Sequence, residues 1–334
     1  MNILVTGGLG FIGSHTVVEL LENGHEVVIV DNLSNSKIEV LDQIEKITGK
    51  RPKFEQVNLL TIEDLRKVFE ENAFDGVIHF AGLKAVAESI EKPIEYYENN
   101  IEGTINLLKC MKEKQVYNLV FSSSACVYGF PKENPITEDS PSNLATNPYG
   151  RTKQFIEEML KDLYISNNNY NITILRYFNP VGAHKSGLIG EDPNGIPNNL
   201  MPIMLKVANK ERDLLHIFGN DYDTEDGTCI RDFIHVVDLA KGHIKAIENV
   251  RDPGVHIYNL GTGKGTSVLN LVNSFNEVNG KNLVSFDYSE RRPGDVPVNY
   301  ANPNKAKYEL QWEACLTIED MCKDAWNFIK KNKK

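Results

Sequence analysis

Two side chains that could exchange a proton with a substrate lie four residues apart between Asn147 and Leu160. They are Tyr149 and Lys153, and the segment around them is typical of the start of a helix, so both side chains should leave from one face. A phenol has an unperturbed pKa of about 10, too high for a useful base at neutral pH, but an ammonium a few ångströms away favours the phenolate. The pair therefore predicts a tyrosine general base assisted by a lysine.

The spacing of this pair is weak evidence by itself. Tyr128 and Lys132 repeat it, with a glycine and a proline between them that exclude a helix. A third group makes the first pair more specific, because Ser124 ends a predicted strand at the edge of the sheet where ligands bind. A serine there is often only a turn or helix cap, but beside Tyr149 it could hydrogen-bond the reacting oxygen atom.

The elements that must position these residues are β-rich runs that alternate with helical stretches over the first 176 residues. The predicted strands cover residues 3–6, 26–30, 54–57, 76–79, 119–122 and 172–176. Six strands joined by helical crossovers indicate an α/β fold with a doubly wound, Rossmann-type parallel sheet in the order 3-2-1-4-5-6. Helices would bury such a sheet on both faces.

Beyond residue 177 the sequence changes to loops rich in glycine, proline and asparagine, such as residues 179–182 and 191–199. We therefore expect a first domain over residues 1–176 and a smaller α/β domain that covers the substrate over residues 177–334. Short β-rich runs at 233–237 and 255–258 indicate that the two domains interleave.

A glycine-rich turn follows the first predicted strand. Gly7, Gly10 and Gly13 fit the spacing G-x-x-G-x-x-G, and Gly8 with the last two fits G-x-G-x-x-G. Glycines at these positions allow a tight turn into the helix predicted over residues 11–22, and a close approach of a pyrophosphate to the N-terminus of that helix. The first domain is therefore predicted to bind a dinucleotide.

The second predicted strand ends in Asp31, an acid placed to hydrogen-bond a ribose 2′-hydroxyl and to repel a 2′-phosphate, which favours NAD over NADP. Asn58, after the third strand, could contact the adenine, and residues 80–84 lie where the cofactor should cross the sheet edge. The alternative is a structural turn with Asp31 as a surface cap. Gly261–Gly265 is also rich in glycine, but it lacks the Ser or Thr of a P-loop and is predicted to be a turn.

Composition argues against several other functions. The net charge is −10 and basic residues cluster only in the tail 330–334, which we expect to be solvated and unstructured, so neither nucleic acid nor a membrane surface is a predicted partner. Residues 2–6 already form a predicted strand and no apolar run of about 18 residues occurs, so we expect neither a signal peptide nor a membrane span. No spacing typical of a metal site is present. The five cysteines are odd in number and widely spaced, which favours reduced thiols in the cytoplasm.

Together these features resemble the extended short-chain dehydrogenase/reductase family and, more narrowly, its UDP-glucose 4-epimerases. The glycine turn, the serine run 122–124 and the pair Tyr149 and Lys153 carry the first resemblance. The second rests on residues 80–86, 176–184, 195–202, 218–222 and 224–228, and it extends from residue 1 to about residue 328.

The resemblance implies a cytoplasmic, homodimeric isomerase of galactose metabolism that interconverts UDP-glucose and UDP-galactose. Tyr149 would take the proton of the sugar 4-hydroxyl while the C4 hydride passes to NAD. Lys153 would lower the pKa of the tyrosine and bind the nicotinamide ribose, and Ser124 would assist the proton transfer. The 4-keto sugar would then present its other face to the bound NADH, so that the returning hydride gives the C4 epimer and NAD stays bound. A hexose that turns must be held loosely, so binding energy would come from the nucleotide.

The resemblance also assigns the contacts to each ligand. NAD would contact Gly7, Gly10, Phe11, Ile12, Gly13, Asp31, Asn32, Asn35, Ser36, Asn58, Leu59, Phe80, Ala81, Gly82, Lys84, Asn99, Ser124, Tyr149, Lys153 and Phe178. The UDP-sugar would contact Ser124, Asn179, Asn199, Leu200, His216, Ile217, Phe218, Arg231, Arg292, Asp295 and Asn299. The two arginines are the candidates for the diphosphate, because planar guanidinium groups suit phosphate oxygens.

Two residues depart from the pattern of the family. Cys126 replaces a common Thr or Ser and is interpreted as a small packing residue. Asn299 stands where members restricted to glucose and galactose carry a bulky tyrosine and members that accept N-acetyl sugars carry a smaller residue. Asn299 therefore predicts that UDP-N-acetylglucosamine and UDP-N-acetylgalactosamine are also substrates, unless the neighbouring Tyr300 fills the space.

Two alternative functions differ from this interpretation. A nucleotide-sugar dehydratase or decarboxylase would use the same scaffold, but a 4,6-dehydratase needs an acid–base pair where this chain has Ala125 and Cys126. A non-catalytic NAD-binding scaffold belongs to another class, and it would usually have lost the tyrosine or the lysine, both of which are present.

Overall fold

A seven-stranded sheet forms the centre of the computed structural model, which describes residues 1–194, 199–249, 253–292 and 294–332. The strand order is β11-β6-β5-β4-β1-β2-β3, and all neighbouring strands are parallel. The strands are β1 (Asn2–Thr6), β2 (Glu26–Asp31), β3 (Lys53–Gln56), β4 (Gly76–His79), β5 (Asn118–Ser124), β6 (Asn171–Tyr177) and β11 (Gly254–Leu260). The predicted α/β class and the predicted order of the first six strands are confirmed.

The seventh strand, β11, comes from the second half of the chain. It pairs with β6 in a register that runs from Gly254 opposite Asn171 to Leu260 opposite Tyr177. The helix α9 (Val236–Glu248) also returns to the first half and packs on α1 (Phe11–Glu22). The two halves are thus interleaved, as the β-rich run at 255–258 predicts.

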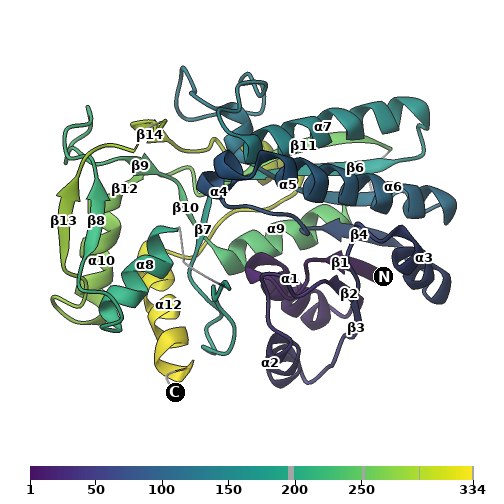
Figure 1. Cartoon of the computed structure of the whole chain (residues 1–334), viewed down its shortest axis with the longest axis horizontal. Coiled ribbons are helices and arrows are strands. Elements are labelled where there is room, and N and C mark those ends of the chain that lie inside the picture. The colour runs from purple at the N-terminus through teal and green to yellow at the C-terminus, as the bar shows by residue number, and fades with distance from the viewer. Residues whose placement is uncertain (195–198, 250–252, 293, 333–334) are drawn as a thin grey trace.

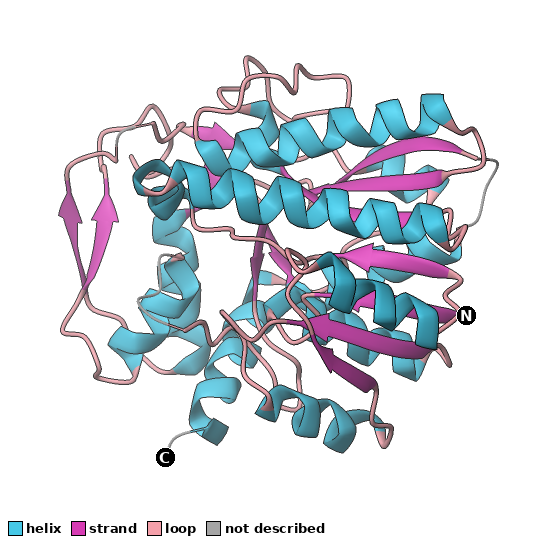
Figure 2. Ribbon diagram, turned by 45° about the vertical axis from the view of Figure 1, so that its right-hand side comes forward, coloured by secondary structure: helices cyan, strands magenta, loops and turns pink. Residues whose placement is uncertain are grey.

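Helices cover both faces of the sheet (Figure 2). One face carries α1, α2 (Glu39–Thr48) and α9. The other carries α3 (Ile62–Glu71), α4 (Val86–Glu91), α5 (Pro93–Tyr97), the π-helix η1 (Glu98–Glu102), α6 (Gly103–Glu113) and α7 (Pro148–Ser166). Side chains of β1 alternate between the two cores, with Ile3 and Val5 in one and Leu4 in the other. The strands are therefore buried on both faces.

The elements after β6 build a smaller region to the left of the sheet in Figure 1. Its apolar core lies among α8 (Leu200–Ala208), α10 (Val268–Asn279), α12 (Ile318–Asn332) and the parallel pair β8 (Leu215–Phe218) and β13 (Phe286–Ser289). The remaining elements are short: η2 (Ala125–Tyr128), β7 (Asn179–Val181), β9 (Ile230–Arg231), β10 (Phe233–His235), β12 (Thr266–Ser267), β14 (Val298–Asn299) and α11 (Asn304–Glu309). The strand predicted at 233–237 is shorter in the structure, because β10 ends at His235 and α9 begins at Val236.

The expectation of an unstructured tail is wrong for residues 330–332, which continue α12. Met321, Cys322 and Ala325 fix this helix in the core of the smaller region, and Lys331 Nζ donates to the Ser186 carbonyl oxygen at 2.8 Å. Residues 333–334, and residues 195–198 of the sequence motif, lie outside the described part of the chain.

Within the described ranges, no helix is long and apolar enough to cross a bilayer. The same ranges contain no cluster of three or more side chains that could hold a metal ion.

Candidate active site

The glycine turn after β1 is shaped by contacts within the protein and remains open on one side. Gly7 has a φ of +69°, and a Cβ at this residue would lie 2.9 Å from the Ala81 nitrogen. A Cβ at Gly13 would lie 2.2 Å from the Gly7 carbonyl oxygen. A Cβ at Gly10 would lie 3.2 Å from that same oxygen, and apart from the adjacent residues it would have no other atom of the described residues within 4 Å. Gly7 and Gly13 are therefore needed to form the turn, whereas Gly10 keeps the N-terminus of α1 accessible to an anionic group.

Asp31 fixes the loop that follows β2. Its Oδ2 accepts from the Leu9 nitrogen at 3.1 Å, and its Oδ1 accepts from the Leu33 nitrogen at 2.9 Å and from Ser36 Oγ at 2.8 Å. The residue is 8% exposed, which argues against a surface cap. Each carboxylate oxygen has two lone pairs, so Oδ2 retains the capacity to accept a ligand hydroxyl.

Other residues predicted to contact the adenosine half of NAD lie in loops at the same sheet edge. The side chains of Asn32 and Asn58 each accept the backbone N–H two residues further on, at 3.0 and 3.1 Å. Asn35 Oδ1 accepts from the Asn194 nitrogen at 3.0 Å and so ties this edge to the second half of the chain. Leu59 is buried in the core, so its side chain anchors the loop after β3.

The loop after β4 is anchored at its start to β1. The Phe80 and Ala81 nitrogens donate to the carbonyl and hydroxyl oxygens of Thr6 at 3.1 and 3.3 Å. Further along, Lys84 Nζ lies 6.0 Å from the Phe11 ring centroid. The predicted residues Phe11 and Lys84 therefore meet beside the start of α1.

Asn100 is a positioning residue that sequence reasoning missed. It lies in the π-helix η1 and is 2% exposed. Its Oδ1 accepts from the Leu83 nitrogen at 2.7 Å, while its Nδ2 donates to the Leu83 carbonyl at 3.0 Å and to Thr152 Oγ1 of α7 at 3.0 Å. The predicted Asn99 donates to it at 3.0 Å, and a Cβ on the predicted Gly82 would lie 3.1 Å from its Oδ1. An asparagine inside a helical stretch gives no sequence signal for this role.

Ser124, Tyr149 and Lys153 meet where β5 ends and α7 begins. Asn147 caps α7 by accepting the N–H three residues further on at 2.8 Å, and a proline occupies the first turn. The helix therefore starts directly before Tyr149, and Tyr149 and Lys153 leave from one face as predicted. Ser124 caps η2 by accepting from the Cys126 nitrogen at 3.2 Å.

Both Tyr149 and Lys153 are buried, with 7% and 5% of their surfaces exposed. Burial raises the pKa of Tyr149 well above its ordinary value, and its hydrogen bond with Ser124 acts in the opposite direction. Burial also lowers the pKa of Lys153 to about 8. Lys153 Nζ lies 6.0 Å from the Tyr149 ring centroid. An ammonium near a phenol favours the phenolate, so at this site it would have to act against the strong effect of burial.

Ser122 and Tyr177 complete the surroundings of Lys153, and neither was predicted individually. Lys153 Nζ donates to the Ser122 carbonyl oxygen at 2.8 Å, its one acceptor among the described residues, so two of its N–H groups are available to a ligand. Ser122 Oγ and the Tyr177 hydroxyl are 2.5 Å apart, and burial raises the pKa of Tyr177 to about 12. Ser122 and Tyr177 are far apart in the sequence, and the pairing of β5 with β6 brings their side chains together.

Three predicted substrate residues meet around β9. Arg231 Nη1 donates to the carbonyl oxygens of Ile230 and Val296 at 2.9 and 2.8 Å, and its Nη2 lies 3.5 Å from Asp295 Oδ1. Asn299 of β14 is the register partner of Arg231. The long contact to Asp295 leaves the guanidinium charge only partly compensated, which suits an anionic ligand.

Four other predicted substrate residues of the smaller region lie on β8 or after β13. The Arg292 guanidinium carbon lies 4.0 Å from the Phe218 ring centroid, a cation–π contact. His216 Nδ1 lies 2.6 Å from Asp287 Oδ1. Ile217 is 2% exposed, so only its backbone can face a ligand.

Glu191 joins the two ligand regions and was not predicted. Its Oε1 accepts from Lys84 Nζ at 3.2 Å and from Asn199 Nδ2 at 2.8 Å. The predicted cofactor residue Lys84 and the predicted substrate residue Asn199 therefore share one carboxylate. Asn179 lies on β7, where its nitrogen donates to the Asp232 carbonyl at 3.0 Å.

Three predicted contact residues pack mainly against apolar neighbours. Phe178 lies with Val127 and Tyr128 in a small core cluster, Ile12 borders the core between the sheet and α1, and Leu200 borders the core of the smaller region. Their side chains support the site more than they line it.

Comparison with known proteins decides the family. Residues 3–261 match the NAD dependent epimerase/dehydratase family. The chain belongs to this family. The UDP-glucose 4-epimerase of Bacillus subtilis (strain 168) is 54% identical over 99% of this chain and 98% of the relative. This match confirms the resemblance to UDP-glucose 4-epimerases.

Solved structures of the epimerase/dehydratase family match over the same length. UDP-glucose 4-epimerase from Bifidobacterium longum, in complex with NAD+ and UDP, has a TM-score of 0.96 and 50% identity over 99% of both chains. The UDP-Glc/GlcNAc 4-epimerase from Campylobacter jejuni has a TM-score of 0.86 and 35% identity over 99% of both chains. The described fold is therefore that of the family.

The buried Lys153 ammonium predicts a pH dependence of stability. The unfolded chain holds this proton up to a pKa of 10.5, whereas the folded chain loses it near pH 8. Between these values the unfolded state binds more protons, so the free energy of unfolding should rise with pH, by about 3 kcal/mol in total. We expect urea unfolding to show this gain for the native protein relative to Lys153→Met. A constant difference between the two proteins from pH 7.5 to 10.5 would contradict it.

Proposed function

We propose that this chain interconverts UDP-glucose and UDP-galactose by transient oxidation at the sugar C4, with NAD as its cofactor. The observation that carries the proposal is the meeting of Ser124, Tyr149 and Lys153 at the carboxyl edge of the sheet. The full-length similarity to UDP-glucose 4-epimerases supports the same reaction.

The residues at this sheet edge fit NAD. The open side of Gly10 offers the pyrophosphate an approach to the N-terminus of α1, and the buried Asp31 carboxylate favours a free ribose 2′-hydroxyl over a 2′-phosphate. The available N–H groups of Lys153 suit ribose hydroxyls. When bound, NAD would supply the acceptor of the C4 hydride, and its reduced form the donor for the opposite face of the 4-keto sugar.

Tyr149 carries the proton chemistry. Its hydroxyl, held by Ser124, takes the proton of the sugar 4-hydroxyl during oxidation and gives it back to the 4-keto oxygen during reduction. The ammonium of Lys153 favours the phenolate against the effect of burial. Ser124 also hydrogen-bonds the reacting oxygen.

The nucleotide half of the substrate supplies the binding energy in this proposal. Arg231 and Arg292 bind the diphosphate, and residues 216–218 line the uracil. Because these contacts are remote from C4, the 4-keto hexose remains free to turn between its two faces. We also propose that residues 1–176 form the NAD domain and residues 177–334 the UDP-sugar domain, which returns β11 and α9 to the first.

Purified protein incubated with UDP-galactose and without added NAD should form UDP-glucose, visible in the anomeric NMR signals. Tyr149→Phe should keep its NAD and bind UDP normally but lose about 10²–10⁴-fold in kcat, because the acid–base group is removed. Tyr164→Phe, which removes a hydroxyl of α7 far from the site, is the matched control and should retain the native rate. Absence of UDP-glucose with the native protein would refute the proposed function.

We propose that N-acetylated UDP-hexoses are substrates as well. Support comes from Asn299, which is smaller than tyrosine and lies opposite Arg231 on β14. The ring of the neighbouring Tyr300 lies against Gly265, where its Cδ1 would be 3.4 Å from a Cβ, and is thereby engaged elsewhere. The similar Campylobacter jejuni enzyme is described as a UDP-Glc/GlcNAc 4-epimerase.

Asn299→Tyr should therefore lose activity on UDP-N-acetylglucosamine while it retains activity on UDP-galactose. We expect the ratio of the two kcat/KM values to fall at least about tenfold, because the larger side chain excludes the acetamido group. Tyr300→Phe, which removes only a hydroxyl, should leave the ratio unchanged. A native protein that does not turn over the N-acetyl substrate would disprove this extension alone.

We propose a cytoplasmic homodimer. All five cysteines are free thiols, which favours a reducing compartment. Ile90 of α4, Ile94 of α5 and Phe155 of α7 are 64%, 73% and 45% exposed on neighbouring helices. Exposed apolar side chains on three helices that contact one another support contact with a second copy.

Ile94→Glu should convert this dimer to a monomer, because a charge at the centre of an apolar interface must lose its hydration. Size-exclusion chromatography with light scattering measures the mass directly. Ile38→Glu, at a 43% exposed position before α2 on the other side of the sheet, should remain dimeric. A native monomer would contradict the proposal.

A further inference from the structure

The face of α7 that carries Tyr149 and Lys153 carries a third polar side chain, Glu157, one helical turn further on. Tyr149, Lys153 and Glu157 are spaced four residues apart, and all three are buried. Glu157 is 1% exposed, although a carboxylate is seldom buried without a specific partner. The proton chemistry does not use it, so its burial calls for a separate explanation.

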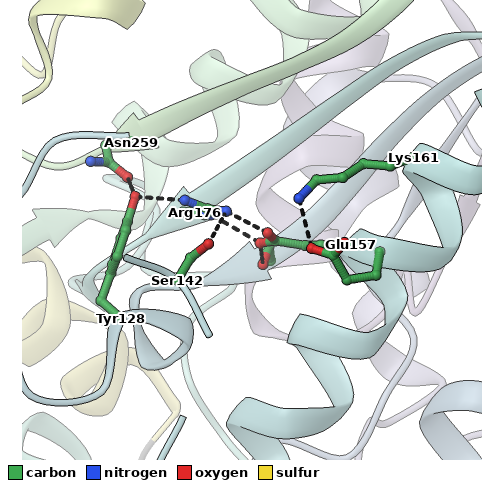
Figure 3. Close-up of polar contacts among 8 residues, drawn as sticks. Tyr128, Ser142, Glu157, Lys161, Arg176 and Asn259 are labelled. Carbon is green, nitrogen blue, oxygen red and sulfur yellow. Dashed lines mark hydrogen bonds and ion pairs between the residues drawn. The ribbon is translucent and has the colours of Figure 1, made fainter. Parts of the chain in front are cut away.

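The Glu157 carboxylate is held by two strands of the sheet. Its Oε1 accepts from Ser123 Oγ of β5 at 2.5 Å and from Arg176 Nε of β6 at 3.0 Å, and its Oε2 accepts from Arg176 Nη2 at 2.5 Å. Figure 3 shows Arg176 lying between Glu157 on one side and Tyr128 and Ser142 on the other. Two nitrogens of the Arg176 guanidinium thus donate hydrogen bonds to the two carboxylate oxygens of Glu157.

The far side of Arg176 is also fixed. Nη1 donates to the Tyr128 hydroxyl at 3.0 Å and Nη2 to Ser142 Oγ at 3.1 Å. Tyr128 in turn donates to Asn259 Oδ1 of β11 at 2.7 Å. Hydrogen bonding and the charge of Glu157 outweigh burial and leave the pKa of Arg176 raised, so the guanidinium stays charged.

These contacts lie directly beside the reacting groups along the chain. Ser123 stands between Ser122, whose carbonyl accepts from Lys153, and Ser124. Arg176 pairs with Ser123 in the β5–β6 register and precedes Tyr177. Any shift of Glu157 would therefore move the two strand ends and α7 relative to one another.

Stability alone does not account for an ion pair at this place. Well-packed apolar side chains of the same volume are often as stabilising as a buried pair, or more so, because two charges must be desolvated. A bidentate arginine–carboxylate pair instead fixes geometry, because it is directional. The pair therefore suits a role in placing α7 against β5 and β6.

We infer that Glu157, through its hydrogen bonds with Ser123 and Arg176, is a positioning residue of the reaction. It holds the part of α7 that carries Tyr149 and Lys153 against the end of β5 that carries Ser122 and Ser124. This inference rests on the proposed epimerase function. Glu157 also places a negative charge one helical turn from the Lys153 ammonium. This charge raises the pKa of Lys153, against the lowering by burial.

Other titratable groups surround this part of α7. They are Tyr96 of α5, His79 of β4, Cys126 and Tyr128 of η2, Tyr177 of β6, and Glu138 in the loop before α7. Cys126 also raises the pKa of Lys153, but less than Glu157 does, and Lys153 itself lowers the pKa of His79. Glu157 is therefore the main charge that opposes burial at Lys153.

The test compares Glu157→Gln with Glu158→Gln. Glu158 is the next residue of α7, is exposed and pairs with Lys161 at 2.7 Å, so it is a matched control that should keep the native kcat and pH profile. Glu157→Gln should retain NAD and a KM for UDP-galactose within about twofold of the native value, but lose about tenfold or more in kcat. The alkaline limb of its kcat–pH profile should move about one unit lower, because Lys153 then loses its proton more readily.

Removal of one charge leaves Arg176 buried without its partner, which can prevent folding. Glu157→Gln combined with Arg176→Gln removes both charges, and it should shift the alkaline limb in the same direction but by less, because the lost positive charge of Arg176 partly offsets the lost negative charge. Ser123→Ala keeps the ion pair and removes only the hydrogen bond from β5 to Glu157. It should lower kcat without moving the alkaline limb of the kcat–pH profile.

The results separate this inference from the proposed function. A native protein without epimerase activity would refute the proposed function. An active native protein whose folded Glu157 variants, single or double, keep the native kcat and pH profile would overturn the inference alone. A native kcat in Ser123→Ala would overturn it as well.

Discussion

The placement of a buried ammonium beside a buried phenol is the constraint on which the structure around the site depends. Lys153 is almost fully enclosed, and its charge is tolerated because the Ser122 carbonyl accepts one of its N–H groups and Glu157 lies one turn away. Burial acts on both groups in the direction that opposes catalysis, since it favours a neutral lysine and a neutral tyrosine. The Ser122 carbonyl and Glu157 are the means by which the protein keeps the Lys153 ammonium charged while it is enclosed.

The same constraint explains why the site lies at the edge of a parallel sheet. The carboxyl ends of β1, β4 and β5 meet there, so the glycine turn, the loop after β4 and Ser124 come together without long loops. Asn100 then ties the loop after β4 to α7 through Leu83 and Thr152. Each ligand-facing residue is held by an element whose own position is set by the two cores on either side of the sheet.

Periodicity and crossover rules are sufficient to predict the central sheet from sequence, because its strands are continuous apolar runs separated by helices. They cannot assign β11 to the sheet edge, since its partner β6 lies far away along the chain. Two-residue strands such as β9 and β14 have no period at all, so Arg231 and Asn299 could be named only through resemblance to a family. Glu191, Asn100 and Tyr177 were missed for a related reason: their roles arise from contacts with residues distant in sequence. The helical tail at 330–332 was missed because its basic residues outweigh, in sequence, the apolar face that continues α12.

β11 is the last strand of the central sheet to be synthesised, and this has a consequence for folding during synthesis. Until residues 254–260 have been synthesised, β6 is the open edge of a six-stranded sheet, with its backbone N–H and C=O groups exposed on one side. Arg176 lies on that edge strand, and its network reaches Asn259 of β11 through Tyr128. The nascent sheet therefore carries both an unpaired edge and an incomplete polar network until residues 254–260 have left the ribosome, and during that interval it is exposed to edge-to-edge aggregation.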